Sequence, residues 1–167
     1  EGTVPLEGTV PLEGTVPLEG TVPLAELSAP VVLTPSAPVA VRRLDVAAPG
    51  DGSGWYLTRT RLDVHLVPGA TGKAVLSTAT NGGHYSAQVL VVSDGRSVTV
   101  DTLGLWDGRR VVTARAWDVS VDFTNYVPEG GVRPGSNRIT YRLEGLRGIK
   151  VSKAVVAADS GIRWTTA

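Results

Sequence analysis

The chain has 167 residues, of which 19% are charged and 42% hydrophobic, and its formal net charge is zero. A neutral chain without a basic run gives no reason to expect nucleic acid as a partner. Its apolar content argues against wholesale disorder. No stretch approaches the roughly 20 apolar residues needed to cross a bilayer, so we expect no membrane span.

The chain contains neither cysteine nor methionine. Without cysteine it can have no disulfide framework, thiolate metal site or cysteine nucleophile. Because the sequence opens at Glu1 rather than at methionine, we expect a processed or trimmed chain, and removal of a signal peptide is one such route. We therefore expect a secreted protein, located outside the cell or at the cell surface.

Residues 1–24, here called the arm, are four identical copies of Glu-Gly-Thr-Val-Pro-Leu. Side chains alternate along an extended strand and six is an even number, so every copy assigns its residues to the same faces. Backbone N–H groups of alternate residues point to opposite edges of a strand. The N–H groups that the prolines lack are therefore all missing from the same edge, and the other edge keeps all its hydrogen-bond donors. One face carries eight aliphatic residues: Val4, Leu6, Val10, Leu12, Val16, Leu18, Val22 and Leu24.

This regularity favours β-strand addition, in which the arm pairs with a sheet edge of another subunit and the eight aliphatic residues are the assembly contacts. The recurring Pro and Gly fit a flexible or polyproline-like stalk equally well. The phase Leu-Glu-Gly-Thr-Val-Pro also resembles the hexapeptide motif of left-handed β-helices, although four copies would make little more than one turn. An artificial fusion tail is a further interpretation.

Beyond the arm, residues 25–37 form a Pro-rich lead-in that contains the apolar run Val31–Leu33, and residues 38–167 form the main domain. Alternation of apolar and polar residues is typical of strands with one wet face. It predicts strands at Tyr56–Leu66, Lys73–Ala79, Tyr85–Val92, Arg96–Thr102, Ala114–Phe123, Asn137–Glu144 and Ile149–Ala157.

Three of these strands have clear inward faces. In the first, Leu62, Val64 and Leu66 face inward, while Arg61, Asp63 and His65 face outward. In Ala114–Phe123 the inward face is Arg115, Trp117, Val119, Val121 and Phe123, and in Asn137–Glu144 it is Ile139, Tyr141 and Leu143.

Turn residues separate the predicted strands. Asp94-Gly95 is a two-residue hairpin signal because both positions tolerate positive φ. Pro49-Gly50-Asp51-Gly52, Pro68-Gly69, Asn81-Gly82-Gly83 and Asp107-Gly108 mark further turns. Closely spaced strands without an intervening helix indicate an antiparallel β-sandwich, immunoglobulin-like or jelly-roll-like, of about eight to ten strands.

The stretch Val119–Leu143 holds a strand ending at an aromatic residue, a Gly/Pro loop, and a Pro-Gly-Ser-Asn corner before the next strand. It resembles a strand pair of the immunoglobulin-like domains on secreted bacterial surface and filament proteins. The resemblance covers about 25 residues and lacks the Cys…Trp…Cys spacing of true immunoglobulin domains. It implies adhesion, scaffolding or filament structure outside the cell.

The residues for catalysis are sparse. His65 and His84 are the two histidines, and no Gly-x-Ser-x-Gly elbow is present. His65 belongs to the solvent-exposed face of a predicted strand. We therefore expect no catalytic residue and no cofactor, and we do not expect an enzyme.

Metal ligands are equally sparse. Asp118 and Asp122 share one outward face, and Asp63 and His65 share another. Calcium takes six to eight oxygen ligands, usually gathered from loops, and no Asp-x-Asp-x-Asp-Gly run occurs. Solvated faces are the simpler interpretation, so we expect no metal site.

Two further groups of residues suggest surface roles. Arg42-Arg43 and Arg109-Arg110 are isolated basic pairs, which we interpret as sheet-edge charges that discourage unwanted pairing. Trp55 and Trp106 flank Gly/Asp loops and are candidates for stacking on a ligand, whereas Trp117 is expected in the core.

Together these features predict a non-enzymatic extracellular structural protein. It would be a subunit of a surface fibre or layer that assembles when the arm adds to a neighbouring subunit. The alternative is a stalked carbohydrate- or protein-binding adhesion module. The expected partners are other copies of the chain, with a surface glycan or protein in the alternative.

Overall fold

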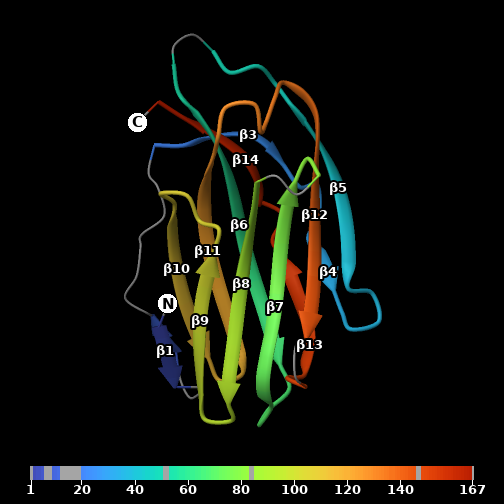
Figure 1. Ribbon diagram of the computed structural model, residues 1–167, viewed down its shortest axis with the longest axis vertical. Coiled ribbons are helices and arrows are strands. Elements are labelled where there is room, and N and C mark those ends of the chain that lie inside the picture. Colours follow the sequence, from blue (N-terminus) through green and yellow to red (C-terminus); the bar gives the residue numbers. More distant parts are fainter. Residues whose placement is uncertain are drawn as a thin grey trace.

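The computed structural model describes residues 2–5, 9–11, 20–50, 53–82, 85–145 and 148–166. Within these ranges the chain forms strands and no helix, and its strand pairs are antiparallel. The strands make two sheets that face each other (Figure 1). The prediction of an all-β protein with two antiparallel sheets is therefore confirmed.

The first sheet, called sheet A, has β1 at one edge and β5 at the other. In spatial order its strands are β1 (Gly2–Pro5), β9 (Ser97–Leu103), β8 (Tyr85–Asp94), β7 (Thr71–Thr80), β12 (Gly135–Gly145) and β5 (Val39–Val46).

The second sheet, called sheet B, is built around β6, its longest strand. Its main path is β2 (Thr9–Pro11), β10 (Arg109–Arg115), β11 (Asp118–Val127), β6 (Trp55–Leu66), β13 (Val151–Val156) and β4 (Val31–Leu33). Two more strands extend it: β14 (Gly161–Thr165) pairs with the first half of β6, and β3 (Val22–Glu26) pairs with β14.

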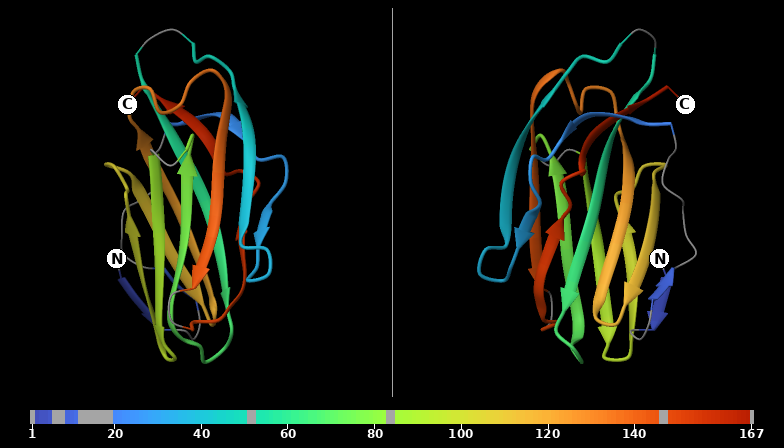
Figure 2. Two further views of the ribbon diagram at one scale, coloured as in Figure 1. Left: turned by 45° about the vertical axis from the view of Figure 1, so that its right-hand side comes forward. Right: turned by 180° about the vertical axis from the view of Figure 1, so that it is seen from behind.

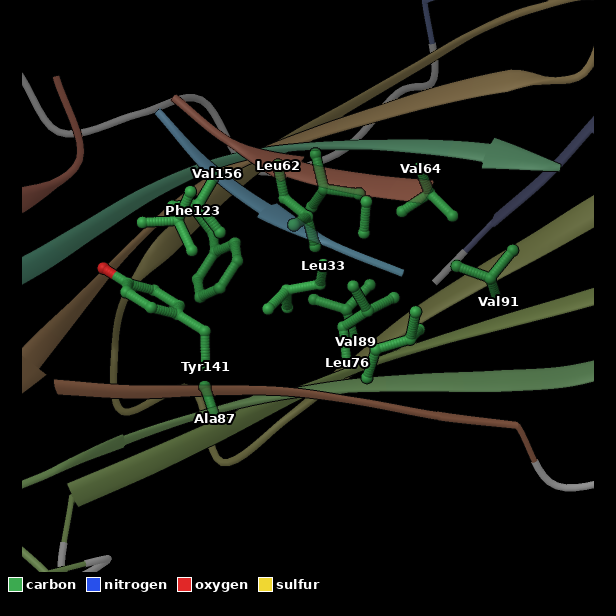
Figure 3. Packing of buried hydrophobic residues seen from close by; sticks show 14 of the residues in the cluster. Leu33, Leu62, Val64, Leu76, Ala87, Val89, Val91, Phe123, Tyr141 and Val156 are labelled. Carbon is green, nitrogen blue, oxygen red and sulfur yellow. The ribbon is translucent and has the colours of Figure 1, made fainter. Parts of the chain in front are cut away.

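The core lies between the inward faces of the two sheets (Figure 3). Sheet A contributes Tyr141 and Val89, and sheet B contributes Phe123 and Val64, all at most 2% exposed. Residues of the lead-in also enter the core, since Leu27, Val31 and Leu33 are buried. Burial of apolar surface from both sheets is what stabilises a sandwich without disulfides.

Most predicted strands fall inside observed ones, and their inward faces are buried as expected. Leu62, Val64 and Leu66 are buried on β6, and Ile139, Tyr141 and Leu143 on β12. Ten of the observed strands, β5 to β14, begin after residue 38, which matches the eight to ten strands expected of the main domain.

The single strand predicted at Ala114–Phe123 is wrong. The chain turns at Ala116 and Trp117, so that β10 and β11 form a hairpin with Ala114 opposite Val119. Ala116 adopts a φ of 50°, a left-handed conformation that favours Gly or Asn, so the sequence carries no turn signal there. Arg115 is therefore exposed, and Trp117 packs half-buried against the core from the turn.

The hairpin between β8 and β9 lies one residue later than predicted. Its two loop residues are Gly95 and Arg96, and Gly95 alone has a positive φ, of 89°. Asp94 instead ends β8, and its carboxylate closes the turn by accepting the backbone N–H groups of Arg96 and Ser97, both at 2.8 Å.

These two hydrogen bonds make the hairpin acid-sensitive. Donation by the Ser97 and Arg96 N–H groups lowers the pKa of Asp94 below its ordinary value of 3.8. The stabilisation is thus complete above that value and is lost as pH falls through the lowered pKa of the folded state. We expect Asp94→Asn to make the free energy of unfolding less dependent on pH below about pH 4.

Urea unfolding of both proteins between pH 2 and pH 6 measures this difference. Identical pH dependence in the two proteins would contradict the role given to Asp94.

Candidate assembly site

The first two copies of the repeat pair with the edge strands of both sheets of their own chain. β1 lies antiparallel along β9 at the edge of sheet A, and β2 lies along β10 at the edge of sheet B. Both strands therefore sit on the same side of the sandwich, as the two views in Figure 2 show. β1 and β2 therefore lie where sheets A and B would otherwise end.

The register places the aliphatic positions of the repeat opposite core residues. Val4 is opposite Val98, which is fully buried, and Val10 is opposite Ala114, which is 2% exposed. The valine position of the repeat is therefore opposite a core residue in both sheets.

The prolines fit the same register. Pro5 is opposite Ser97 and Pro11 is opposite Thr113. Proline has no N–H, so each of these can only be a pair that exchanges no backbone hydrogen bonds. The backbone N–H groups of Gly2 and Val4 then point toward β9. The six-residue repeat allows this geometry, because an even period keeps the prolines off the donor positions.

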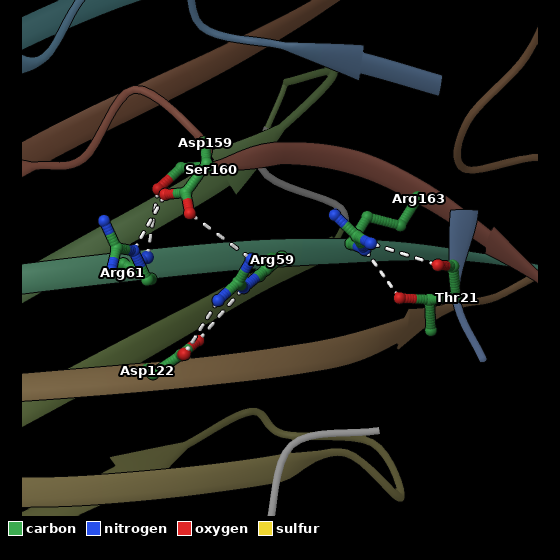
Figure 4. Close-up of polar contacts among 7 residues, drawn as sticks. All are labelled: Thr21, Arg59, Arg61, Asp122, Asp159, Ser160 and Arg163. Atoms are coloured by element: carbon green, nitrogen blue, oxygen red, sulfur yellow. Dashed lines mark hydrogen bonds and ion pairs between the residues drawn. The ribbon is translucent and has the colours of Figure 1, made fainter. Parts of the chain in front are cut away.

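The fourth copy joins the arm to the sandwich. β3 pairs with β14, where a bulge shifts the register between Ile162 and Arg163. Val22 is 56% exposed, and Leu24 is half-buried against the core. Arg163 fixes the start of this strand, because its guanidinium donates to the hydroxyl of Thr21 at 2.6 Å and to its carbonyl at 3.0 Å (Figure 4).

Of the eight predicted assembly contacts, Val4, Val10, Val22 and Leu24 therefore lie in strands that pair within the chain. Leu6, Leu12, Val16 and Leu18 lie outside the described residues. Contact of these residues with a neighbouring subunit stays a prediction.

The two basic pairs differ in their surroundings. Arg42 and Arg43 are exposed on β5, the edge strand of sheet A, where a charge can oppose pairing. Arg110 departs from that interpretation because it is only 8% exposed, inward-facing on β10, and donates to Thr102 Oγ1 at 3.2 Å. Burial lowers the pKa of its guanidinium.

The two tryptophans proposed for ligand stacking are both exposed, Trp55 by 56% and Trp106 by 58%. Trp55 begins β6 and meets the ring of Tyr126 edge-on at 6.5 Å. Trp106 lies in the loop between β9 and β10, where Asn125 holds its backbone N–H and also donates to the carbonyl of Gly104. The backbone that carries each side chain is therefore held in place, by strand pairing at Trp55 and by Asn125 at Trp106.

The outer face of sheet B gathers the polar residues that the sequence placed on separate strands. The pairing of β6 with β11 sets His65 opposite Asp118 and Asp63 opposite Ser120. His65 Nδ1 lies 2.7 Å from Asp118 Oδ1, beside a hollow of about 240 Å³. The Ser120 hydroxyl donates to Asp63 rather than to His65.

This arrangement differs from a nucleophilic triad, in which the serine hydroxyl donates to the histidine. His84 lies outside the described residues.

A salt-bridge network continues along this face (Figure 4). Arg59 makes a two-pronged pair with Asp122, at 3.2 and 2.9 Å, and Arg61 pairs with Asp159 at 2.8 Å. The hydrogen bonds that Arg59 donates to the carboxylate of Asp122 raise the pKa of its guanidinium. The Asp residues of this face are thus engaged by arginine, histidine and serine.

The described ranges contain neither a cluster of metal ligands nor a helix that could span a membrane. Among those residues, no three His, Asp or Glu side chains gather so as to hold a metal ion. In the same residues, no helix has the length and apolar character to span a membrane.

Comparison of the chain with protein families, curated proteins and solved structures finds no match.

Proposed function

We propose that this protein is a non-enzymatic structural subunit of an extracellular fibre or layer, and that subunits are joined when the arm of one adds to the sheet edges of the next. The observation that carries the proposal is the pairing of β1 with β9 and of β2 with β10, the strands at which the two sheets would end without the arm. Strands from one short arm thereby pair with both sheets.

The pairing within one chain supplies the contacts for pairing between chains. An element that docks on its own domain can dock identically on another copy, which is domain swapping. When each subunit gives its arm to the next and the rotation does not close, the product is a filament. The identical hexads suit this exchange, because every copy offers the same face and the same donors.

Exchange of this kind depends on concentration. A tethered arm meets its own edges at an effective concentration on the order of millimolar. Swapped assemblies are therefore expected in concentrated protein or at a crowded surface. In dilute solution the closed single chain is expected to dominate.

The immunoglobulin-like class and the extracellular location are parts of the same proposal. They are supported by the resemblance of Val119–Leu143, whose two strands are β11 in sheet B and β12 in sheet A. Consecutive strands that cross between the two sheets are usual in immunoglobulin-like sandwiches.

Deletion of residues 1–19 tests the proposal while keeping β3 in place. We expect the full chain to form larger species as its concentration rises, and the truncated chain to lack these ordered assemblies. Sedimentation velocity and electron microscopy over a range of concentrations measure the difference. A peptide of two repeats, added in excess, should suppress assembly of the full chain by occupying β9 and β10.

Two results would contradict the proposal. One is a full chain that stays monomeric at every concentration. The other is a truncated chain that forms the same ordered polymers.

The exposed Trp55 and Trp106 favour a second candidate, the carbohydrate- or protein-binding module. Exposed indole rings are suitable platforms for stacking on sugar rings. If this holds, Trp55→Ala and Trp106→Ala should each weaken binding to neutral oligosaccharides in an NMR titration, whereas Trp117→Phe should not. Wild-type protein that binds none of the oligosaccharides would speak against a sugar ligand.

A further inference from the structure

We infer that a basic hollow on the outer face of sheet A binds a tetrahedral oxyanion, a sulfate or phosphate group. The hollow has a volume of about 610 Å³ and lies over β5 and β12, at the edge of sheet A opposite β1. It is lined mainly by Arg43, Arg133, Arg138, Asn81 and Ser136. This site is separate from the arm and goes beyond the proposed assembly function.

The positive charge of the hollow is unbalanced. The lining contains three guanidinium groups and no carboxylate. Among the described residues, none of the three arginines forms an ion pair. An anionic ligand would neutralise the positive charge of these three guanidinium groups.

The register of β5 and β12 places two of the arginines side by side. Arg43 on β5 lies directly opposite Arg138 on β12. Like charges at directly opposed positions destabilise a sheet. The nearest acidic residue on the same face of β5 is Asp45, which lies opposite Ser136 and does not line the hollow. An anion between the two guanidinium groups would turn this repulsion into attraction.

Hydrogen bonds of two asparagines hold the backbone at the floor of the hollow. Asn137 is 1% exposed, and its amide nitrogen donates to the carbonyls of Arg133 at 2.7 Å and of Gly135 at 3.1 Å. Asn81, with a φ of 49°, donates to Asn137 Oδ1 at 2.9 Å and accepts the N–H of Arg138 at the same distance. These bonds fix the backbone from which Arg133 and Arg138 project.

One of the arginines is itself oriented by its neighbour. Arg43 Nε donates to Ser136 Oγ at 2.6 Å, which leaves the two terminal nitrogens of its guanidinium for a ligand. Planar guanidinium groups bind sulfate and phosphate oxygens in pairs, which is why arginine rather than lysine suits this role. The open hollow admits either the free ion or the same group carried as an ester on a sugar.

An NMR titration tests the site, with sodium phosphate, sodium sulfate and sodium chloride compared at equal ionic strength. We expect phosphate and sulfate, but not chloride, to shift the Nε–H signals of Arg43 and Arg138. Arg138→Gln should weaken this binding about tenfold, since it removes a charge-assisted pair of hydrogen bonds. Binding should also weaken as salt is raised, because the site is open to solvent.

Arg142→Gln is the matched control, because Arg142 lies on the same strand and face but pairs with Glu144 at 3.9 Å and does not line the hollow. It should change the affinity by less than about twofold. Arg43→Gln provides a second variant of the site, and thermal unfolding checks that each variant is folded.

The source of the anion is distinguished by a sulfated oligosaccharide and its unsulfated parent. Tighter binding of the sulfated sugar than of inorganic sulfate would indicate an ester ligand, and equal binding would indicate the free ion. The inference is overturned if the arginine signals respond equally to chloride. It is also overturned if Arg138→Gln and Arg142→Gln weaken binding to the same extent. Neither result depends on whether the arm assembles.

Discussion

Phe123→Ala is expected to lower the free energy of unfolding by about 3–5 kcal/mol, because the substitution leaves a cavity that a close-packed core cannot fill. Phe123 is 1% exposed on β11 and lies in the core with Tyr141 of the facing sheet (Figure 3). It is the sole phenylalanine of the chain. Its ring therefore makes a large contribution to the contact between the two sheets.

Urea unfolding measures this loss. Val32→Ala is the control, because Val32 is 53% exposed on β4 and its truncation should change stability by no more than about 0.5 kcal/mol. Losses of similar size for the two variants would contradict the assignment of Phe123 to the core.

Gly161→Ala is expected to separate β3 from β14. A Cβ at this position would lie 2.1 Å from the carbonyl oxygen of Ala25 and 2.9 Å from Cα of Glu26. Both are backbone atoms, so the side chain cannot be accommodated by a rotamer change and the strand itself must move. We expect a cost of about 1–3 kcal/mol, the range typical of overpacking.

Hydrogen exchange localises this effect. Amides of β3 and β14 should lose protection in the variant while those of β8 and β9 keep theirs. Gly50→Ala is the matched control, since a Cβ there meets no atom within 4 Å. Unchanged protection in β3 would show that the fourth repeat does not depend on this close approach.

Where a strand alternates strictly, its sequence sufficed to predict both its position and its inward face. Asn137–Glu144 is such a case, and its three predicted inward residues are buried. Besides β10, whose end the prediction merged with β11, two strands of the main domain were missed for physical reasons. β5 carries the adjacent Arg42 and Arg43, which an edge strand tolerates but which break the alternation. β14 has only five residues, too few for a clear period.

The candidate sites depend on register, which sequence patterns do not contain. His65 and Asp118 are 53 residues apart and meet only because β6 pairs with β11. Arg43 and Arg138 likewise become neighbours through the pairing of β5 with β12. A hexad pattern could specify which face and which edge of the arm are suited to pairing. It could not specify that copies one and two would lie on different sheets.

Addition of the arm of one chain to β9 of a neighbouring chain is the contact on which the proposed assembly depends. It can be measured with two variants, Thr3→Cys and Thr99→Cys, because these residues are directly opposed. They are two positions from the Pro5–Ser97 pair, so they too exchange no backbone hydrogen bonds. Such Cα atoms are about 4.5 Å apart, within reach of a disulfide. The chain has no native cysteine to interfere.

The two variants are mixed at high concentration, oxidised and analysed for linked chains, with Thr3→Cys mixed with Arg142→Cys as the control. If arms are exchanged, the fraction of disulfide-linked dimers between the Thr3→Cys and Thr99→Cys variants should be well above that of the control, and it should increase with protein concentration. The proposed exchange of arms is contradicted if disulfide-linked dimers of the two variants are no more frequent than in the control, and if a Thr3→Cys/Thr99→Cys double variant forms its disulfide only within single chains at every concentration.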